Sequence, residues 1–521
     1  MRKRLVLLVT FGLLAAAALA WYATRRGPMD IGEFVRAARP PRIRPDYRDV
    51  VIPPNLAPLN FVVEEPGREF CVTISAADGS RIRVDSTTPS LVIPAEPWRK
   101  LLESHRGQPL DFDVYVRCCD CEARTRFQTF RVTVADAEID RYVVYRLIRP
   151  VYNLYVHMGI YQRDLESYEE TRILGNASFK NGCVNCHAFA QRSPDRMLLQ
   201  VRGEGVTSMV LVRDGAVEKV NTKAFGGNPA AYSAWHPNGR AIAFSINTLQ
   251  QFFHSLGEVR DVYDWGSDIG VYLADSNAVI TSPKLADPLR LETFPAWSPD
   301  GRWLYFCSAP PLPLERFREI RYDLQRIRYD PERESFGELE TVLTAKEAGG
   351  SLLEPAVSPD GRFLLVTICD CGSFPVYQRS ADMALLDLRS LPTPRLQRLA
   401  CNSPESDSWH AWSSNSRWIV FASKRRDGVF GRIYLSYISE TGAASNPVLM
   451  PQSDPTFYDS CLNNYNRPEL ICAPIRIRER DIARAILAAS KTKDAISRGG
   501  PAASAEPESQ QYQPADEKGP Q

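Results

Sequence analysis

A short pattern that recurs along the chain limits the folds open to it. Its clearest copy is Trp297-Ser298-Pro299-Asp300-Gly301-Arg302, and three further copies begin at Trp235, Val357 and Trp412. In each copy a strand residue precedes a tight Pro-Asp-Gly-like turn and an apolar run follows, which is typical of a β-hairpin. Ser193-Pro194-Asp195-Arg196 is a degenerate fifth copy. The pattern therefore predicts a protein built from repeated hairpins.

A second alternating segment follows the repeats, at residues 268–273, 382–387 and 432–437. Each of these segments begins a second hairpin, so one repeat contains four strands. Four-stranded units repeated along a chain are the blades of a β-propeller. The sequence therefore predicts an all-β fold dominated by a propeller.

Two segments at opposite ends of the repeat region have no partners of their own. Residues 159–165 resemble the third strand of a blade, and residues 466–472 resemble its inner strands. Joined, they form one more blade and remove the free sheet edges. We therefore expect a six-bladed propeller over residues 150–475, with five or seven blades as alternatives.

A smaller β domain is expected ahead of the propeller, at residues 51–148. Short alternating segments separated by Pro or Gly are typical of an immunoglobulin-like sandwich; they are residues 59–63, 70–74, 81–84, 112–116 and 130–134. Cys71 lies in one of them, and Cys118, Cys119 and Cys121 follow another. A disulfide from Cys71 to one of the three is plausible in an exported protein, and a metal clip is the alternative.

The two ends of the chain have distinct compositions. Residues 1–23 contain an apolar run, 5–23, flanked by arginines, with Ala18-Leu19-Ala20 as a possible cleavage site. This is a signal peptide or a membrane anchor, so the rest of the chain is expected to be exported. Residues 24–50 are rich in Pro and Arg and predict a linker. Residues 476–521 predict a short helix at 481–490 and a disordered tail.

Overall charge excludes one class of partner. The chain of 521 residues has 63 Lys and Arg against 62 Asp and Glu, which gives a net charge of +1. Nucleic-acid binding depends on a basic excess that neutralises phosphates. We therefore expect no nucleic acid as a partner.

The residues that carry chemistry are Cys183-Val184-Asn185-Cys186-His187. Cys-x-x-Cys-His is the attachment signature of a c-type haem, because the two thiols can add to the two vinyl groups of one porphyrin. His187 then lies beside the iron as its proximal ligand. The alternatives are a thioredoxin-like redox pair or a zinc site, and a zinc site would need two more ligands such as Cys369 and Cys371. We expect one covalent haem c held by Cys183, Cys186 and His187.

The repeat is similar to TolB-like propeller repeats over residues 150–475. The chain as a whole resembles a family of exported bacterial proteins that place a single Cys-x-x-Cys-His ahead of the first TolB-like blade, after a short β domain. The segments that carry this resemblance are residues 142–148, 159–163, 183–187, 234–239 and 413–421. The resemblance implies the fold and one haem, but no reaction.

The sixth iron ligand is sought on the face of the propeller that carries the motif. By strand direction this face also carries the long loops 247–266, 308–318, 369–380 and 423–431. His254 is the first candidate for the distal ligand and His410 the second, followed by His157 or Met158, or by no protein ligand.

The other histidines are expected to have structural roles. We expect His236 to be a turn residue that packs on Trp235 at the opposite face of the propeller. His105 belongs to the β domain.

Three functions follow from one haem on a propeller. The first is one-electron transfer to or from a docked redox partner protein, in the periplasm or at the inner membrane through residues 5–23. The second is a protein-binding scaffold with a structural or sensory haem, and the third is a haem enzyme acting on peroxide or a nitrogen oxide. The pairing of Cys369, Cys371, Cys401, Cys461 and Cys472 is left open by the sequence.

Overall fold

The protein divides into two compact units. The computed structural model describes residues 29, 31–119, 123–149, 157–253, 260–488 and 492–498. The smaller unit consists of the chain up to Asp136 together with Pro451–Ser460, and the larger unit holds Ala137–Met450 and the chain from Cys461. Residues 1–23, expected to be a signal or anchor, lie outside the described residues. Within the described ranges no helix is both long and apolar enough to cross a membrane.

The smaller unit contains a seven-stranded and a three-stranded sheet. Each of the five predicted segments contains a strand, and their buried aromatic rings meet in the core, where Phe112 stacks on Phe130 and Phe61 packs edge-on against it. The larger sheet consists of β1 (Val35–Arg36), β3 (Val50–Ile52), β5 (Glu69–Ser75), β6 (Arg81–Ser86), β8 (Pro109–Arg117), β9 (Arg124–Arg126) and β10 (Phe130–Val134). The smaller consists of β2 (Ile43–Arg44), β4 (Phe61–Val63) and β7 (Ser90–Leu91).

A helix in this unit was not expected from the strand pattern. Helix α2 (Ala95–Ser104) buries Trp98, Leu101 and Leu102, and the Trp98 indole donates to the Leu56 carbonyl at 2.9 Å. Apolar residues at i, i+3 and i+4 lie on one face of a helix, which is the signal that could have found it.

The predicted linker and domain boundary need correction. Strand β1 pairs with β9, and β2 pairs with β4, so the described part of residues 24–50 belongs to the smaller unit rather than to a linker. These strands fill sheet edges, which removes unpaired backbone groups. At the other end the units divide after Asp136 and not at residue 148, because strand β11 (Tyr142–Ile148) pairs within the larger unit.

The larger unit contains six sheets in its described residues. Sheet one is β14 (Cys183–Phe189), β15 (Arg196–Arg202), β16 (Ser208–Arg213) and β17 (Ala216–Asn221); sheet two is β18 (Ala230–Trp235), β19 (Ala241–Phe253), β20 (Arg260–Leu273) and β21 (Ala278–Ile280). Sheet three is β22 (Leu291–Trp297), β23 (Trp303–Ala309), β24 (Asp323–Asp330) and β25 (Ser335–Leu343); sheet four is β26 (Ser351–Val357), β27 (Phe363–Cys369), β28 (Asp382–Asp387) and β29 (Leu396–Arg398). Sheet five is β30 (Asp407–Trp412), β31 (Trp418–Ser423), β32 (Arg432–Tyr437) and β33 (Val448–Leu449).

The remaining sheet joins the two ends of the repeat region, and we call it the closing sheet. Its order is β13 (Glu170–Gly175), β12 (Gly159–Asp164), β11 and β34 (Asn464–Ile471). The segments 159–165 and 466–472 thus lie in one sheet, as the sequence predicts. Residues 466–472 supply a single strand, and β11 supplies the second.

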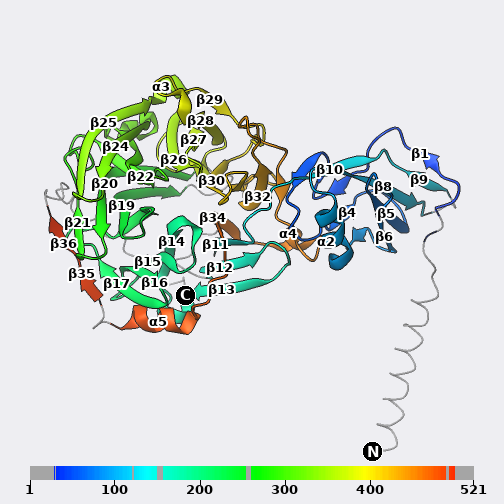
Figure 1. Cartoon of the computed structure of the whole chain (residues 1–521), viewed down its shortest axis with the longest axis horizontal. Helices are drawn as coiled ribbons and strands as arrows, with labels where there is room; N and C mark the ends of the chain where they lie inside the picture. Colours follow the sequence, from blue (N-terminus) through cyan, green and yellow to red (C-terminus); the bar gives the residue numbers. More distant parts are fainter. Residues whose placement is uncertain are drawn as a thin grey trace, which may run out of the picture. The chain divides into compact units, whose positions relative to one another are not determined.

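The six sheets pack in cyclic order through six inner strands. Strand β14 packs against β18, then β22, β26, β30 and β34 follow in turn, and β34 packs back against β14. Figure 1 shows the sheets of this unit arranged around a common centre. The inner strands therefore bring side chains from distant parts of the sequence together at this centre.

The repeated turns link the first two strands of a sheet. Gly301 lies between β22 and β23 with φ +71°, a left-handed conformation that glycine adopts without strain, and Gly361 has the same φ. The tryptophan before the turn reaches the preceding sheet, because the Trp297 indole donates to the Ala234 carbonyl and the Trp412 indole to that of Ala356. The repeat pattern thus encodes packing between sheets as well as turns.

The expected loop 247–266 is for the most part a hairpin. Strands β19 and β20 stay paired from Ala241 and Leu273 out to Phe253 and Arg260. The ladder continues across a register shift between Thr248 and Leu249, so this hairpin extends beyond the neighbouring strands. His254, which follows β19 in the sequence, lies outside the described residues.

The C-terminal region is more ordered than expected. Helix α5 (Glu479–Leu487) agrees with the predicted helix at 481–490, and it buries Ile482, Ala483 and Ile486. Beyond it, β35 (Thr492–Asp494) pairs in parallel with β17, and β36 (Ile496–Arg498) pairs in parallel with β21. The part of the predicted disordered tail that the structure describes therefore covers the outer edges of sheets one and two.

Candidate functional site

The Cys-x-x-Cys-His motif lies on the inner strand of sheet one. In β14, Val184 pairs with Val201 and His187 with Leu199, so the inner strand has one residue more than its partner between these pairs. This is a β-bulge, and it changes the direction of the side chains around it. The extra residue falls within Asn185-Cys186, in the middle of the motif.

The same bulge occurs in every sheet of the larger unit. In all six, the register between the inner strand and its neighbour shifts by one residue at the same level. The bulged pairs are Asn185 and Cys186, Ala231 and Tyr232, Phe294 and Pro295, Glu354 and Pro355, Trp409 and His410, and Arg467 and Pro468. The motif therefore occupies a position that other sheets use for aromatic or charged residues.

Four of these bulges hold a residue in the left-handed region. The φ angles are 53° at Phe294, 55° at Glu354, 54° at Trp409 and 45° at Arg467. Bulky residues rarely adopt this conformation, and clusters of them are associated with functional sites. The centre of the larger unit is thus both polar and conformationally strained.

His187 is a buried imidazole without a hydrogen-bond partner. Its side chain is 1% exposed, and neither ring nitrogen forms a hydrogen bond with any described residue. The pKa of His187 is lowered to about 3, chiefly by burial and in part by the Arg467 and Arg146 guanidinium groups. The nearby backbone of Val144 acts in the opposite direction and raises the pKa of His187, but it is not placed to form a hydrogen bond with the ring. His187 is therefore neutral, with a lone pair available for a metal ion.

Arg146 holds the motif strand against the closing sheet. Its guanidinium donates to the side-chain oxygen of Asn185 at 2.8 Å, to the Val184 carbonyl at 3.3 Å and to the side-chain oxygen of Asn466 at 3.3 Å. Cys183 is buried. The side chain of Cys186 lies outside the described part of the chain. The residues that the structure describes fit a c-type haem, because they place a buried thiol and an unpaired imidazole on one strand.

His410 lies on the inner strand of sheet five and is 8% exposed. Its Nδ1 is 3.3 Å from the Thr367 hydroxyl, which donates to the Glu354 carboxylate at 2.9 Å. Its Nε2 is buried and has no hydrogen-bond partner among the described residues. Burial lowers the pKa of His410 to about 4, so this imidazole is also neutral.

Two carboxylates share this centre with Arg467. Burial raises the pKa of Glu354 and that of Glu469 to about 7, and the positive charge of Arg467 opposes both shifts. Glu354 also accepts from the Trp409 backbone at 2.8 Å, and Glu469 from the Phe189 backbone at 3.2 Å. One oxygen of each carboxylate is buried without a hydrogen-bond partner in the described ranges.

An aromatic group fills another part of the centre. Tyr232 stacks on Phe294 with ring centroids 4.0 Å apart, and Trp409 lies 5.9 Å from Tyr232 and 6.1 Å from Phe294. The three rings come from bulges in sheets two, three and five. Sequence reasoning missed this group because it depends on strand register. The aromatic residues at equivalent repeat positions were the available signal.

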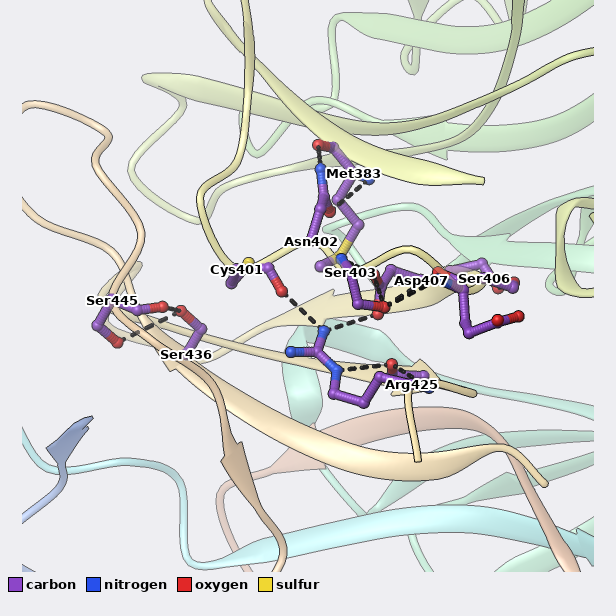
Figure 2. A network of polar contacts seen from close by, with 12 residues as sticks. Met383, Cys401, Asn402, Ser403, Ser406, Asp407, Arg425, Ser436 and Ser445 are labelled. Carbon is purple, nitrogen blue, oxygen red and sulfur yellow. Dashed lines mark hydrogen bonds and ion pairs between the residues drawn. The ribbon is translucent and has the colours of Figure 1, made fainter. Parts of the chain in front are cut away.

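The loop 423–431 is anchored by a buried ion pair (Figure 2). Arg425 donates to Asp407 and to the Cys401 carbonyl, both at 2.7 Å, and the Asp407 side chain is fully buried. Ser403 donates to the second carboxylate oxygen of Asp407 from both its backbone and its hydroxyl. These contacts fix one of the loops that the sequence predicts on the motif-bearing face.

A second buried acidic group was not predicted. Burial raises the pKa of Asp264 to about 6, of Asp268 to about 7 and of Glu292 to about 9, and neighbouring carboxylates add to the shifts of Asp268 and Glu292. They come from two sheets, and no repeat pattern relates them. Among the described residues no group of three or more His, Cys, Asp or Glu is placed to hold a metal ion.

The remaining histidines are separate from this centre. His236 does not pack on Trp235; its ring lies edge-on to Trp297 at 4.7 Å, and its Nε2 is 3.0 Å from the Gly301 carbonyl. His236 lies in the turn after β18 of sheet two, and its ring packs against sheet three instead. His105 bonds to the Leu101 carbonyl in the smaller unit. His157 is exposed, and Met158 packs against the core between the closing sheet and sheet one.

The disulfides considered from the sequence are not formed between the cysteines whose positions the structure describes, namely Cys71, Cys369, Cys371, Cys401, Cys461 and Cys472. Cys71 pairs with Tyr115, whereas Arg117 pairs with Glu69, so Cys118 lies about 10 Å further along the ladder, beyond disulfide reach. Cys121 lies outside the described residues. Cys461 and Cys472 contact Arg432 and Asp140 rather than each other or Cys401. The Cys369 thiol approaches the Cys371 carbonyl at 3.4 Å instead of its thiol.

Comparisons with known proteins reveal only distant structural similarity. No family model matches the chain, and no curated protein matches it. A luciferin-regenerating enzyme is 12% identical with a TM-score of 0.35, covering 59% of this chain and 86% of its own. An oligogalacturonate lyase with manganese is 13% identical with a TM-score of 0.34, covering 72% and 99%. Kuenenia stuttgartiensis hydrazine synthase is 11% identical with a TM-score of 0.34, covering 54% and 71%. This level of similarity establishes neither a shared fold nor a shared activity.

Proposed function

We propose that the chain is an exported c-type cytochrome in which Cys183 and Cys186 hold one haem c covalently and His187 is the proximal iron ligand. The observation that carries this proposal is His187 itself, a buried imidazole with both nitrogens unpaired among the described residues, on the same strand as two motif cysteines. Burying a polar side chain costs free energy unless a hydrogen-bond partner or a metal ion satisfies its polar atoms. An iron ion bound by the imidazole supplies that partner.

The scaffold of this cytochrome is, in our proposal, a six-bladed TolB-like propeller preceded by an immunoglobulin-like domain. The five meanders of four consecutive strands, the closing sheet built from both ends of the repeat region and the cyclic packing of all six sheets support six blades. The core between the sheets of the smaller unit supports the sandwich. Membership in the exported TolB-like family with one haem motif is part of this proposal.

The function we propose is one-electron transfer to or from a docked redox partner in the periplasm. A haem held in this way would supply reversible exchange of one electron at its iron. The chain's own residues bind and orient it: His187 supplies a neutral nitrogen, Arg146 fixes the motif strand, and Arg467 places positive charge nearby. A propeller much larger than a haem carrier requires is suited to binding a partner.

The first experiment is haem staining of denatured protein after expression in a host that attaches c-type haem. The wild-type protein is expected to keep its stain, and Cys183→Ala and Cys186→Ala are expected to lose it. Cys472→Ala, an exposed cysteine outside the motif, is the matched control and should keep the stain. Covalent haem that persists in both motif variants would overturn the attachment site. A redox titration then tests for a single one-electron step.

A further inference from the structure

The hydrogen bonds around His410 determine which of its nitrogens carries a lone pair. Glu354 Oε2 accepts two hydrogen bonds, from the Trp409 backbone N–H and from the Thr367 hydroxyl. The single hydroxyl hydrogen of Thr367 is therefore directed at Glu354. Its oxygen can only accept from His410 Nδ1, which places the ring hydrogen on Nδ1 and leaves a lone pair on Nε2.

This assignment holds for ionised Glu354, whose carboxylate oxygens can only accept hydrogen bonds. The Nε2 atom of His410 is buried and forms no hydrogen bond with any described residue. His410 thus has the arrangement of a metal-bound histidine, with one nitrogen oriented by a hydrogen-bonded relay and the other unpaired.

The position of His410 relates it to the motif. Strand β34 packs against both β30, which carries His410, and β14, which carries His187. Arg467 lies in the bulge of β34, which is equivalent to the bulges that hold the motif in β14 and His410 in β30. His410 also occupies the bulge of its sheet, the position that Cys186 occupies in sheet one.

We propose that His410 Nε2 is the second axial ligand of the haem iron, and that Thr367 and Glu354 are positioning residues that fix its tautomer and ring orientation. This inference rests on the proposed function, since it requires a haem attached at Cys183 and Cys186. His410 would bind the iron through the Nε2 lone pair while Nδ1 keeps its hydrogen. A haem held by His187 and His410 would have two histidine ligands and would be low-spin in the ferric state.

The test uses the full chain with attached haem and optical and EPR spectra. His410→Ala is expected to keep covalent haem, to lose the low-spin ferric signal in favour of a high-spin one, and to bind carbon monoxide when reduced. His410→Met is expected to remain six-coordinate, to show the far-red charge-transfer band of a methionine-ligated ferric haem, and to have a higher reduction potential. His105→Ala, in the smaller unit, is the control and should leave the spectrum unchanged.

The positioning role has its own test. Thr367→Val removes the hydroxyl at nearly constant volume and is expected to broaden or shift the low-spin EPR signal and to increase carbon monoxide binding, whereas Thr367→Ser should restore the wild-type spectrum. A low-spin spectrum unchanged in His410→Ala would overturn the ligand assignment, as would its loss in His254→Ala. Haem missing from the wild-type protein would instead overturn the proposed function, so the two failures are distinguishable.

Discussion

Arg146 of the closing sheet donates a 2.8 Å hydrogen bond to Asn185, one of the two residues between the motif cysteines. The same guanidinium reaches the Val184 carbonyl and Asn466, so one side chain ties both ends of the repeat region together. Hydrogen bonds to a charged group contribute about 1.5–3 kcal/mol each, and partial exposure of Arg146 reduces this.

Arg146→Ala is therefore expected to lower the free energy of unfolding of the larger unit by about 1–3 kcal/mol in urea denaturation. The exposed Arg149 lies on the same segment, and Arg149→Ala should change the stability by less than about 0.5 kcal/mol. Equal effects of the two substitutions would show that the contacts of Arg146 with the motif strand do not stabilise the fold.

Two turn glycines provide a matched pair. Gly301 and Gly361 both have φ +71°, but a Cβ at residue 301 would lie 2.4 Å from His236 Nε2, whereas none of the described atoms lies within 4 Å at residue 361. Gly361→Ala is expected to cost about 1–2 kcal/mol from left-handed strain alone. Gly301→Ala should cost about 1–3 kcal/mol more, because the His236 ring must move. Thermal unfolding of both variants checks the difference, and an equal loss of stability would contradict it.

Because of Glu292, the stability of the fold is expected to decrease as pH rises. Its pKa is raised from 4.5 to about 9, chiefly by burial. The folded state therefore holds a proton that the unfolded state releases above pH 4.5, so this contribution is complete below that pH and is lost as pH rises towards 9. The slope from one such group is about −1.4 kcal/mol per pH unit.

Glu292→Gln mimics the protonated side chain and is expected to flatten the fall in stability between pH 5 and pH 9 that wild-type protein shows. Urea unfolding at several pH values measures this effect. Glu332→Gln, at an exposed carboxylate, should leave the wild-type curve unchanged. A Glu292→Gln curve parallel to that of wild-type protein would show that Glu292 ionises normally in the folded state.

Removing only one partner of the ion pair between Asp407 and Arg425 is expected to lower the stability of the fold strongly. Asp407→Ala leaves a largely buried guanidinium without its carboxylate, which costs about 3–5 kcal/mol. Because Arg425 is in the loop 423–431, hydrogen exchange of that loop should also increase. A stability loss below about 1 kcal/mol would indicate that the Cys401 carbonyl alone holds Arg425.

The parts of this structure that follow from local pattern could be predicted from the sequence. Trp297 and the Pro-Asp-Gly turn after it predict a hairpin, and the absence of partners for residues 159–165 predicts the closing sheet. Both signals reside within a few residues, because turn conformation and strand alternation are local properties. The Cys-x-x-Cys-His motif is likewise a local pattern, so it could be recognised from five residues, and the haem that it predicts stays a prediction.

The features that were missed depend on how strands align. The bulges at Glu354 and Arg467 exist only relative to the partner strand, so no pattern within one strand reveals them. The relay from His410 through Thr367 to Glu354 joins three strands whose register the sequence does not specify. The composition of residues 492–498 predicts disorder, because these residues cannot form a core of their own. In the structure they pair with the outer strands of sheets one and two.

The closing sheet also sets an order of events during synthesis. Strand β34 packs beside the motif strand and pairs with β11, but it is translated long after both. Until Ile471 has been translated, β14 lacks one of its two neighbouring inner strands, and the motif remains accessible from that side. A machinery that must reach Cys183 and Cys186 in an open chain would therefore have the interval between translation of residues 187 and 464 in which to act.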